Sequence, residues 1–527
     1  MDIVHTMLNR RHFLKIAAAI GSLSSLPIIE ALASRDRMEL GEPEPFSFDD
    51  LIARAKALSK AAYEEPTIQH ADILETIDYD AFQEIVFKRE LGLGEGTNVN
   101  FPAQLFHLGR YFKAPVRINW LEQGQARRVI YHPDYFTFGD TGLDQELPDD
   151  IGFSGFRLQD GQDANTDWLA LLGGAYFRSS GELNQYGLSA RAIAIDTALP
   201  TPEEFPRFTE FWLQPGTVNA DEYTVYALID GPSITGAFSM VCKKAGKVQQ
   251  DIKARFFARK DIKRMGIAPL TSMFWFGEHN RHQAKDWRPE IHDSDGLAMW
   301  TGAGERLWRP LNNPNSVMTN SFVDETPKGF GLMQRDRAFH NYEDDGVFYD
   351  RRASVWIEPL GDWGKGVVQL VEIPTDDEIH DNIVMYWVPD EPVTAGSDWA
   401  FDYRLFWNAD EPYPSETVAK VIHTRLGNGG VPGQPRPEGR KKFVVDFEGG
   451  PLLDVEKLDD VKPIISASAG EISNDYALQV VGGKNWRAFF DLEVDGNEPV
   501  NLRLYLQLGD KTLTETWLYQ YHPFPYG

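Results

Sequence analysis

Short segments with the two-residue period of β-strands recur along most of this chain and constrain its fold more than any other feature. Residues 116–120 and 128–131 flank the sequence Glu-Gln-Gly-Gln, which is typical of a hairpin turn. Further segments of this kind cover residues 192–196, 224–229, 252–257, 354–358, 367–373, 383–387 and 400–407. Because βαβ units would need helices between the strands and few helical patterns occur, the sequence predicts a large antiparallel β-sandwich.

Only the region after residue 46 shows a clear helical pattern. Ser47 is a typical helix N-cap, and apolar residues at helical spacing continue from it to about Ala62. A second short helix is expected over residues 80–87.

The composition changes near residue 410. Residues 411–440 are broken by Pro and Gly, which predicts an irregular linker. Short strand patterns then resume at residues 443–447, 464–467, 476–481, 486–494, 502–508 and 516–521. Strands this short and closely spaced are typical of an immunoglobulin-like sandwich. We therefore expect an all-β protein with a large N-terminal sandwich over residues 34–410 and a small immunoglobulin-like sandwich over residues 441–527.

The N-terminus has the pattern of an export signal. Arg10 and Arg11 precede a short apolar run, and Ala31-Leu32-Ala33 provides a cleavage site of small residues. This pattern predicts a twin-arginine signal peptide over residues 1–33 and a periplasmic location. Since the apolar run is too short and too rich in Ala, Gly and Ser to span a bilayer, stable membrane insertion is not expected.

The composition favours a neutral partner. Lys and Arg number 52 against 79 Asp and Glu, and the net charge of −27 argues against nucleic acid and anionic membrane surfaces. The 14 Trp and 19 Tyr residues supply rings that pack β-sandwich cores and also stack on sugar faces. Cys242 is the only cysteine, and the histidines show no zinc-ligand spacing, so neither a metal nor another cofactor is expected.

Two acidic segments are candidates for chemistry. His292, Asp293 and Asp295 fall within four positions, and crowded carboxylates among apolar neighbours such as Trp300 can have a raised pKa, as a general acid or base requires. Asp381 opens an apolar strand, where desolvation favours a carboxyl that keeps its proton near neutral pH. Together, Asp381 and Asp293 would supply the acid and base of glycosidic cleavage. The alternative is a solvated Asx-turn at Asp293.

The stretch between these segments offers two further side chains. Arg352 could orient a carboxylate, and Tyr349 could hydrogen-bond a sugar hydroxyl. The alternative is the ordinary start of a strand, with arginines at the surface. Trp300 is expected among the aromatic rings that would line a substrate cleft.

Several long motifs resemble those of the periplasmic glucan biosynthesis proteins G and D, and the export signal favours the D branch. The motifs are LGGAYFR at residues 172–178, QYGLSAR at 185–191, IKRMGIAPLTSMF at 262–274, HDSD at 292–295, PLNNP at 310–314, PKGFGL at 327–332, WGKG at 363–366 and ETWLYQY at 515–521. The resemblance covers nearly the whole chain. It implies a large N-terminal β-sandwich joined to an immunoglobulin-like domain, a periplasmic location, and a role in shaping the β-1,2-linked glucose backbone of osmoregulated periplasmic glucans.

The same resemblance suggests roles for individual residues. Asp381 matches the general acid and Asp293 the proposed base of inverting glycoside hydrolases that act on β-1,2-glucan. Tyr349, Arg352 and Glu378 are expected near this substrate. The alternatives are a β-1,2-glucan transglycosylase, which would remodel or cyclise the chain, and a non-catalytic glucan-binding scaffold. A membrane-bound glucan synthase is a candidate partner, and the sequence leaves the oligomeric state open.

The chain also departs from the family pattern beside the acid. His380 stands before Asp381 where an apolar residue is expected, and Phe348 replaces a larger ring. A histidine beside the acid could alter the strength of that acid.

Overall fold

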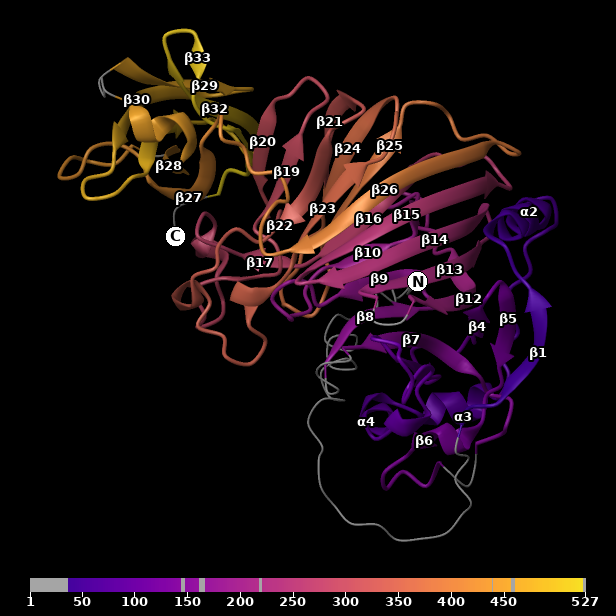
Figure 1. Ribbon diagram of the computed structural model, residues 1–527. Coiled ribbons are helices and arrows are strands. Elements are labelled where there is room, and N and C mark those ends of the chain that lie inside the picture. Colours follow the sequence, from indigo (N-terminus) through magenta and orange to yellow (C-terminus); the bar gives the residue numbers. More distant parts are fainter. Residues whose placement is uncertain are drawn as a thin grey trace.

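The computed structural model describes residues 37–143, 147–160, 166–217, 220–437, 439–455 and 460–524. The predicted signal peptide, residues 1–33, lies outside these ranges. Strands dominate the described chain, and the few helices are short (Figure 1). The predicted all-β fold class is therefore confirmed. In the described part of the chain, no helix is both long enough and apolar enough to cross a membrane.

Two large sheets form the N-terminal sandwich (Figure 1). The first is a 16-stranded sheet with the order β1 (Leu40–Pro45), β5 (Gln125–Val129), β4 (Arg117–Glu122), β12 (Arg207–Pro215), β13 (Glu222–Asp230), β14 (Ile234–Ala245), β15 (Lys247–Ala258), β26 (Asp398–Asn408), β23 (Ser354–Pro359), β22 (Gly329–Met333), β19 (Gly296–Trp300), β20 (Arg306–Pro310), β34 (Thr516–Tyr521), β32 (Val500–Leu508) and β29 (Val461–Ala467), with β33 (Lys511–Thr512) beside β32. The second is a 10-stranded sheet with the order β21 (Met318–Glu325), β24 (Lys365–Glu372), β25 (Ile383–Pro389), β16 (Met265–Ser272), β10 (Ser189–Arg191), β9 (Tyr176–Ser179), β8 (Asp167–Leu172), β7 (Phe153–Gln159) and β3 (Ala103–His107), with β11 (Ile193–Ile195) beside β16.

The pairing of the strands is almost entirely antiparallel. Among the named strands, only β4–β12 and β20–β34 pair in parallel. The predicted hairpin is confirmed as β4 and β5, which are joined at Gln123 and Gly124, both with positive φ. A left-handed backbone of this kind is typical of two-residue hairpin loops.

The core lies between the two sheets, because alternate side chains of each strand point inward. In the second sheet, Phe177, Ala190 and Leu270 belong to this core. Their neighbours in the sequence therefore point to the outer face of that sheet. This outer face is where the candidate site is found.

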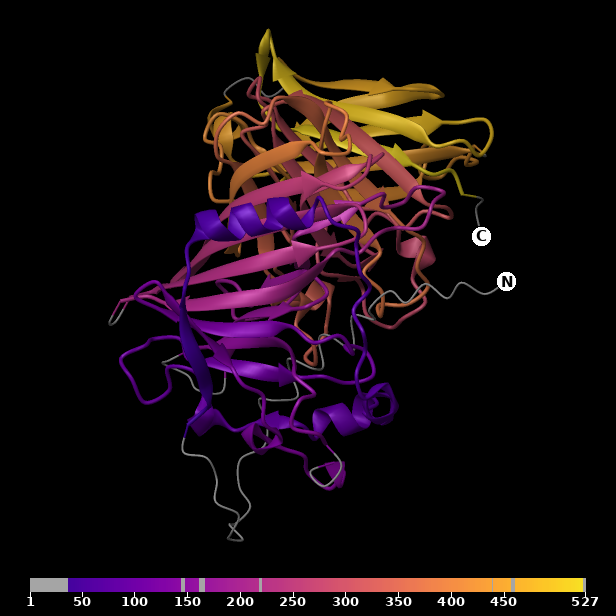
Figure 2. The same cartoon turned by 90° about the vertical axis from the view of Figure 1, so that its right-hand side faces the viewer.

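Helix α2 (Phe48–Leu58) covers part of the outer face of the first sheet (Figure 2). Ser47 caps it as predicted, because its hydroxyl accepts a hydrogen bond from the backbone N–H of Asp50 at 3.1 Å. Leu51 and Ala55 pack against side chains of that sheet. The helix ends earlier than the predicted Ala62.

Short elements complete the N-terminal part. They are α3 (Ala71–Thr76), α4 (Tyr79–Gln83), β2 (Val86–Phe87), η2 (Arg89–Leu91), η3 (Pro133–Tyr135), β6 (Phe136–Thr137), β17 (Phe274–Phe276), η5 (Arg281–Gln283), β18 (Ile291–His292), η6 (Phe339–Asn341) and η7 (Tyr349–Arg351). The helix predicted over residues 80–87 is thus only partly correct, because α4 ends at Gln83 and residues 86–87 pair as a strand with β6.

The C-terminal sandwich packs a four-stranded sheet against the end of the first sheet. The smaller sheet has the order β27 (Lys420–Asn428), β28 (Arg440–Glu448), β31 (Trp486–Glu493) and β30 (Glu471–Gln479), and η8 (Gly450–Asp454) follows β28. Phe443 and Phe490 stack at 4.8 Å between ring centroids in its core. Trp308 and Trp356 of the first sheet belong to the same core, so the two sandwiches share buried surface.

Residues 411–440 differ from the expected irregular linker, because they contain β27. This strand pairs with β28 in the C-terminal sheet. A register shift between Val421 and His423 interrupts its two-residue alternation. The bulge hides the strand pattern, and the Pro and Gly residues that follow strengthen the appearance of a linker.

Candidate active site

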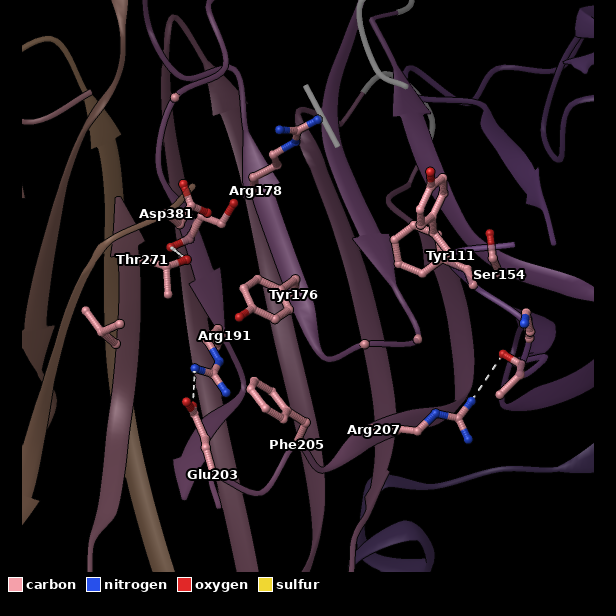
Figure 3. Close-up of a pocket in the computed structure, with 18 of the residues that line it drawn as sticks. Tyr111, Ser154, Tyr176, Arg178, Arg191, Glu203, Phe205, Arg207, Thr271 and Asp381 are labelled. Atoms are coloured by element: carbon pink, nitrogen blue, oxygen red, sulfur yellow. Dashed lines mark hydrogen bonds and ion pairs between the residues drawn. The ribbon is translucent and has the colours of Figure 1, made fainter. Parts of the chain in front are cut away.

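A pocket with a volume of about 300 Å³ lies on the outer face of the second sheet (Figure 3). Its floor comes from alternate positions of β9, β10 and β16, the positions that the core leaves pointing outward. Asp381 and Arg178 lie at one end of the pocket, and Tyr111 and Ser154 lie at the other. The predicted acid is therefore partly exposed at a concave surface of the size that small ligands and sugar units use.

Aromatic and cationic side chains alternate along the pocket wall. Arg191 pairs with Glu203 at 2.8 Å. Its guanidinium lies 5.1 Å from the ring of Tyr176 and 5.0 Å from the ring of Phe205. Burial lowers the pKa of Arg178 to about 9, although the negative charge of Asp381 is among the influences that raise it. Flat rings beside fixed hydrogen-bonding groups suit a sugar, whose hydroxyls are polar and whose ring faces are apolar.

Asn382 fixes the start of β25, directly after Asp381. Its carboxamide oxygen accepts a hydrogen bond from the backbone N–H of Phe274 at 2.8 Å. Its amide nitrogen donates to the carbonyls of Phe274 and Ile373, both at 2.9 Å. The side chain is buried, and β25 continues by pairing with β16. Asp381 is therefore held next to the chain segment that follows β16.

Asp293 lies on the other side of that same segment. Its backbone N–H donates to the carbonyl of Met273 at 2.8 Å, next to the pairing of Phe274 with His292. The side chain of Asp293 is 0% exposed, and Arg352 Nη1 lies 3.1 Å from its Oδ1. Residues 272–274 therefore stand between the two predicted catalytic aspartates.

Asp293 does not line the pocket. Gly187 does line the pocket, and Arg352 packs against it. A Cβ atom added to Gly187 would lie 3.0 Å from the Cβ of Arg352. Arg352 thus stands directly behind the pocket wall, with Asp293 beyond it. Asp293 is fully buried, and the pocket does not open onto its carboxyl group.

Tyr349 and Glu378 extend the network around Arg352. The Arg352 guanidinium lies 4.8 Å from the Tyr349 ring. The Tyr349 hydroxyl donates to Glu378 Oε2 at 2.6 Å, and Arg288 Nη1 lies 3.0 Å from the same oxygen. The structure therefore brings four of the predicted site residues, Asp293, Arg352, Tyr349 and Glu378, into one buried network.

Trp300 lies apart from this network. It is at the far end of β19, where the Arg306 guanidinium stands 3.8 Å from its ring centroid. The two residues line a separate cavity together with Tyr505 and other residues of the C-terminal sandwich. The structure thus does not bring Trp300 to the pocket beside Asp381.

The raised carboxyl pKa expected among the crowded residues belongs to Asp295. Burial raises the pKa of Asp295 to about 6. Its Oδ2 accepts hydrogen bonds from the backbone N–H groups of Arg335 and Asp336, both at 2.9 Å. Burial also acts to lower the pKa of His292, but the hydrogen bond and charge of Glu290 outweigh it, and the pKa is raised.

Several residues of the site were not predicted from the sequence. Arg178 and Arg191 occupy outward positions of strands that are otherwise buried, and such arginines are the one signal that could have identified them. Asn382 and Arg288 gave no signal of this kind, because their partners lie in distant segments. Across the described residues, no group of three or more His, Cys, Asp or Glu side chains is placed to hold a metal ion.

Comparisons with known proteins agree with the motifs. The model of a family described as "Periplasmic glucan biosynthesis protein, MdoG" matches residues 46–521. Glucans biosynthesis protein D 2 of Ralstonia nicotianae is 51% identical over 530 residues, which cover 98% of each chain. Probable glucans biosynthesis protein D of Shewanella oneidensis is 47% identical over 92% of this chain and 90% of its own. Glucans biosynthesis protein D of Stenotrophomonas maltophilia is 44% identical over 99% of each chain. This chain therefore belongs to the family of periplasmic glucan biosynthesis proteins.

Proposed function

We propose that this protein acts in the periplasm and shapes the glucose backbone of osmoregulated periplasmic glucans by inverting endo-hydrolysis of β-1,2-glucan. One observation carries the proposal: Asp381 stands in a pocket lined by rings and fixed polar groups, and the segment that holds it also holds Asp293. The names of the relatives, which refer to glucan biosynthesis, support the substrate class.

In this mechanism, the glucan lies along the pocket with a glycosidic oxygen at Asp381. Protonated Asp381 donates its proton to that oxygen as the bond breaks. Water attacks the opposite face of the sugar, and Asp293 accepts the proton that the water loses. Because Arg352 and the pocket wall separate Asp293 from the pocket, a relay through a sugar hydroxyl or another water would carry that proton. The mechanism draws on no metal or cofactor.

The side chains around Asp293 restrict its movement. Arg352 Nη1 lies 3.1 Å from Asp293 Oδ1 and fixes the orientation of the carboxylate. Tyr349 and Glu378 restrict the movement of Arg352 from the other side. The network would therefore hold the carboxylate in one place until a substrate completes the path.

The test is the release of reducing ends from linear β-1,2-glucan. Asp381→Asn should lose nearly all activity, because an amide cannot protonate the leaving oxygen. Asp376→Asn is the matched control, since Asp376 is an exposed carboxylate of the same loop, and it should keep full activity. Proton NMR of the first products should show the α-anomer, as inversion of a β-linkage requires. Undiminished activity of Asp381→Asn would remove this residue from the acid role.

The two alternatives give different products. A transglycosylase uses a sugar hydroxyl in place of water, so chain lengths would change or rings would form without new reducing ends. A non-catalytic scaffold would bind glucan and leave its chain length unchanged. Thin-layer chromatography of glucan incubated with the protein separates these outcomes.

The periplasmic location depends on the predicted export signal. Replacing both Arg10 and Arg11 with lysine should keep the protein in the cytoplasm, because the pair is the defining feature of a twin-arginine signal. Fractionation of cells that express either form tests this. Equal amounts of both forms in the periplasm would exclude twin-arginine export.

A further inference from the structure

The loop between β17 and β18 presents an exposed tryptophan. The protein has 14 tryptophans, all within the described residues, and Trp287 is the only one that is exposed, at 72%. A large aromatic side chain of this kind is favoured in a buried position. Its exposure leaves the flat face of the ring open to a ligand.

A rigid turn supports this ring. Asp286 Oδ1 accepts hydrogen bonds from the backbone N–H and the Nε of Arg288, both at 2.9 Å. Asp286 Oδ2 accepts a third from Nη2 of the same arginine at 3.1 Å. The residues on either side of Trp287 are thus joined to each other, which holds the ring at the tip of the turn.

Arg288 connects this turn to two other loops. Its Nη1 lies 2.5 Å from Asp344 Oδ2 and 3.0 Å from Glu378 Oε2. The arginine side chain is only 11% exposed, so these ion pairs are largely shielded from water. Asp344 also accepts hydrogen bonds from the N–H groups of Gly346 and Val347. One buried cation therefore joins three loops that are far apart in the sequence.

The same cation places Trp287 in a fixed relation to the candidate active site. Glu378 also accepts a hydrogen bond from the hydroxyl of Tyr349 at 2.6 Å. It precedes Asp381 by three positions in the chain. Trp287 itself is not among the residues that line the pocket around Asp381. The ring is thus outside the pocket but rigidly linked to the loop that carries the proposed acid.

We propose that Trp287 is a stacking platform for a glucose ring of a long β-1,2-glucan, outside the sites where the bond is broken. This inference rests on the proposed glucan-active function. The face of an indole matches the C–H groups on one face of a pyranose ring. Because the turn is already rigid, stacking orders few additional groups and so costs little entropy. Because Trp287 does not line the pocket, the proposal predicts that only a glucan long enough to extend beyond the pocket contacts the ring.

The experiment measures binding in the Asp381→Asn background, so that the ligand stays intact. The two ligands are long linear β-1,2-glucan and a β-1,2-linked glucose trimer. Trp287→Ala should raise the Kd for the long glucan roughly tenfold, which corresponds to the binding free energy of about one aromatic stacking contact. It should change the Kd for the trimer by less than about twofold. Trp287→Phe should keep most of the affinity, because a smaller ring still stacks.

Tyr476→Ala is the matched control, since Tyr476 is an aromatic residue that is 46% exposed in the C-terminal sheet. It should bind both ligands as the parent does. Long-glucan binding that is unchanged in Trp287→Ala, or weakened equally in Tyr476→Ala, would overturn the platform while leaving the proposed function intact. A parent that binds neither ligand would overturn the proposed function as well.

Discussion

Replacing Asn382 with leucine should destabilise the protein and also lower the activity that depends on the position of Asp381. The Asn382 side chain is 1% exposed and makes three hydrogen bonds to the backbone, one to the N–H of Phe274 and one each to the carbonyls of Phe274 and Ile373. Leucine has a similar volume but can make none of these bonds. Three backbone groups would then lose their partner in a site that water does not reach.

The expected cost follows from these three groups. A buried polar group left without a partner costs about 1–3 kcal/mol, and the apolar leucine offsets part of the total. The free energy of unfolding should therefore fall by about 3–5 kcal/mol. Asn382→Asp keeps the acceptor for the N–H of Phe274 but cannot donate to the carbonyls while it is charged. It should therefore regain part of its stability as the pH falls, because a protonated carboxyl can donate one hydrogen bond.

Urea denaturation followed by tryptophan fluorescence measures the change in stability. Asn315→Leu is the control, because Asn315 is exposed, and it should shift the free energy of unfolding by less than about 0.5 kcal/mol. Activity on β-1,2-glucan is then measured at a temperature where every variant is folded. A midpoint equal to that of the parent would refute the hydrogen-bonding argument. A destabilised variant with full activity would refute the idea that Asn382 positions Asp381.

Three further predictions concern the buried network. Arg352→Met should lower the free energy of unfolding by about 3–5 kcal/mol, because it removes the guanidinium next to buried Asp293. Adding Asp293→Asn should recover much of this loss in a double-mutant cycle. Losses that simply add in the double mutant would contradict a coupling between the two side chains. Tyr349→Phe should lower the free energy of unfolding by about 1.5–3 kcal/mol, because the Tyr349 hydroxyl donates a hydrogen bond to the carboxylate of Glu378. Thermal denaturation measures this change, and an unchanged Tm would argue against a strong hydrogen bond. Burial raises the pKa of Asp295 from its ordinary 3.8 to about 6. Between these values the folded protein binds a proton that the unfolded chain does not, so the stability falls as the pH rises through this range. Asp295→Asn should remove about 2–3 kcal/mol of that pH dependence, and a parallel pH profile in the variant would show that Asp295 is not its source.

The sequence predicts a strand most clearly where one face of the strand is buried and the other is more exposed. In β32, Leu502, Leu504 and Leu506 are buried, and the residues between them are more exposed. That alternation is visible without a structure. β27 was missed because a bulge near Val421 breaks the alternation. Local periodicity therefore predicts regular strands and fails where the register shifts.

The candidate site was predictable only where a local pattern marks it. Asp381 stands out because a continuous apolar strand follows it. Arg288 and Asn382 are equally central to the geometry, but their partners lie in other segments, and no local pattern reveals such contacts. Trp300 shows the opposite error. It is near Asp293 in the sequence, but an extended strand moves away by about 3.3 Å per residue, so β19 carries Trp300 away from the turn at Asp293.

The position of Asp293 bears on the choice between hydrolysis and transglycosylation. The carboxylate is fully buried, and Arg352 stands between it and the wall of the pocket near Gly187. If Asp293 is the base, the attacking group must pass its proton along a chain of hydrogen bonds rather than directly. Such a chain forms only when its members occupy fixed positions, and a bound glucan can supply some of them through its hydroxyls. The base would then act only when substrate is in place. The same two aspartates could release a chain or transfer it, according to whether water or a sugar hydroxyl stands at the start of that path.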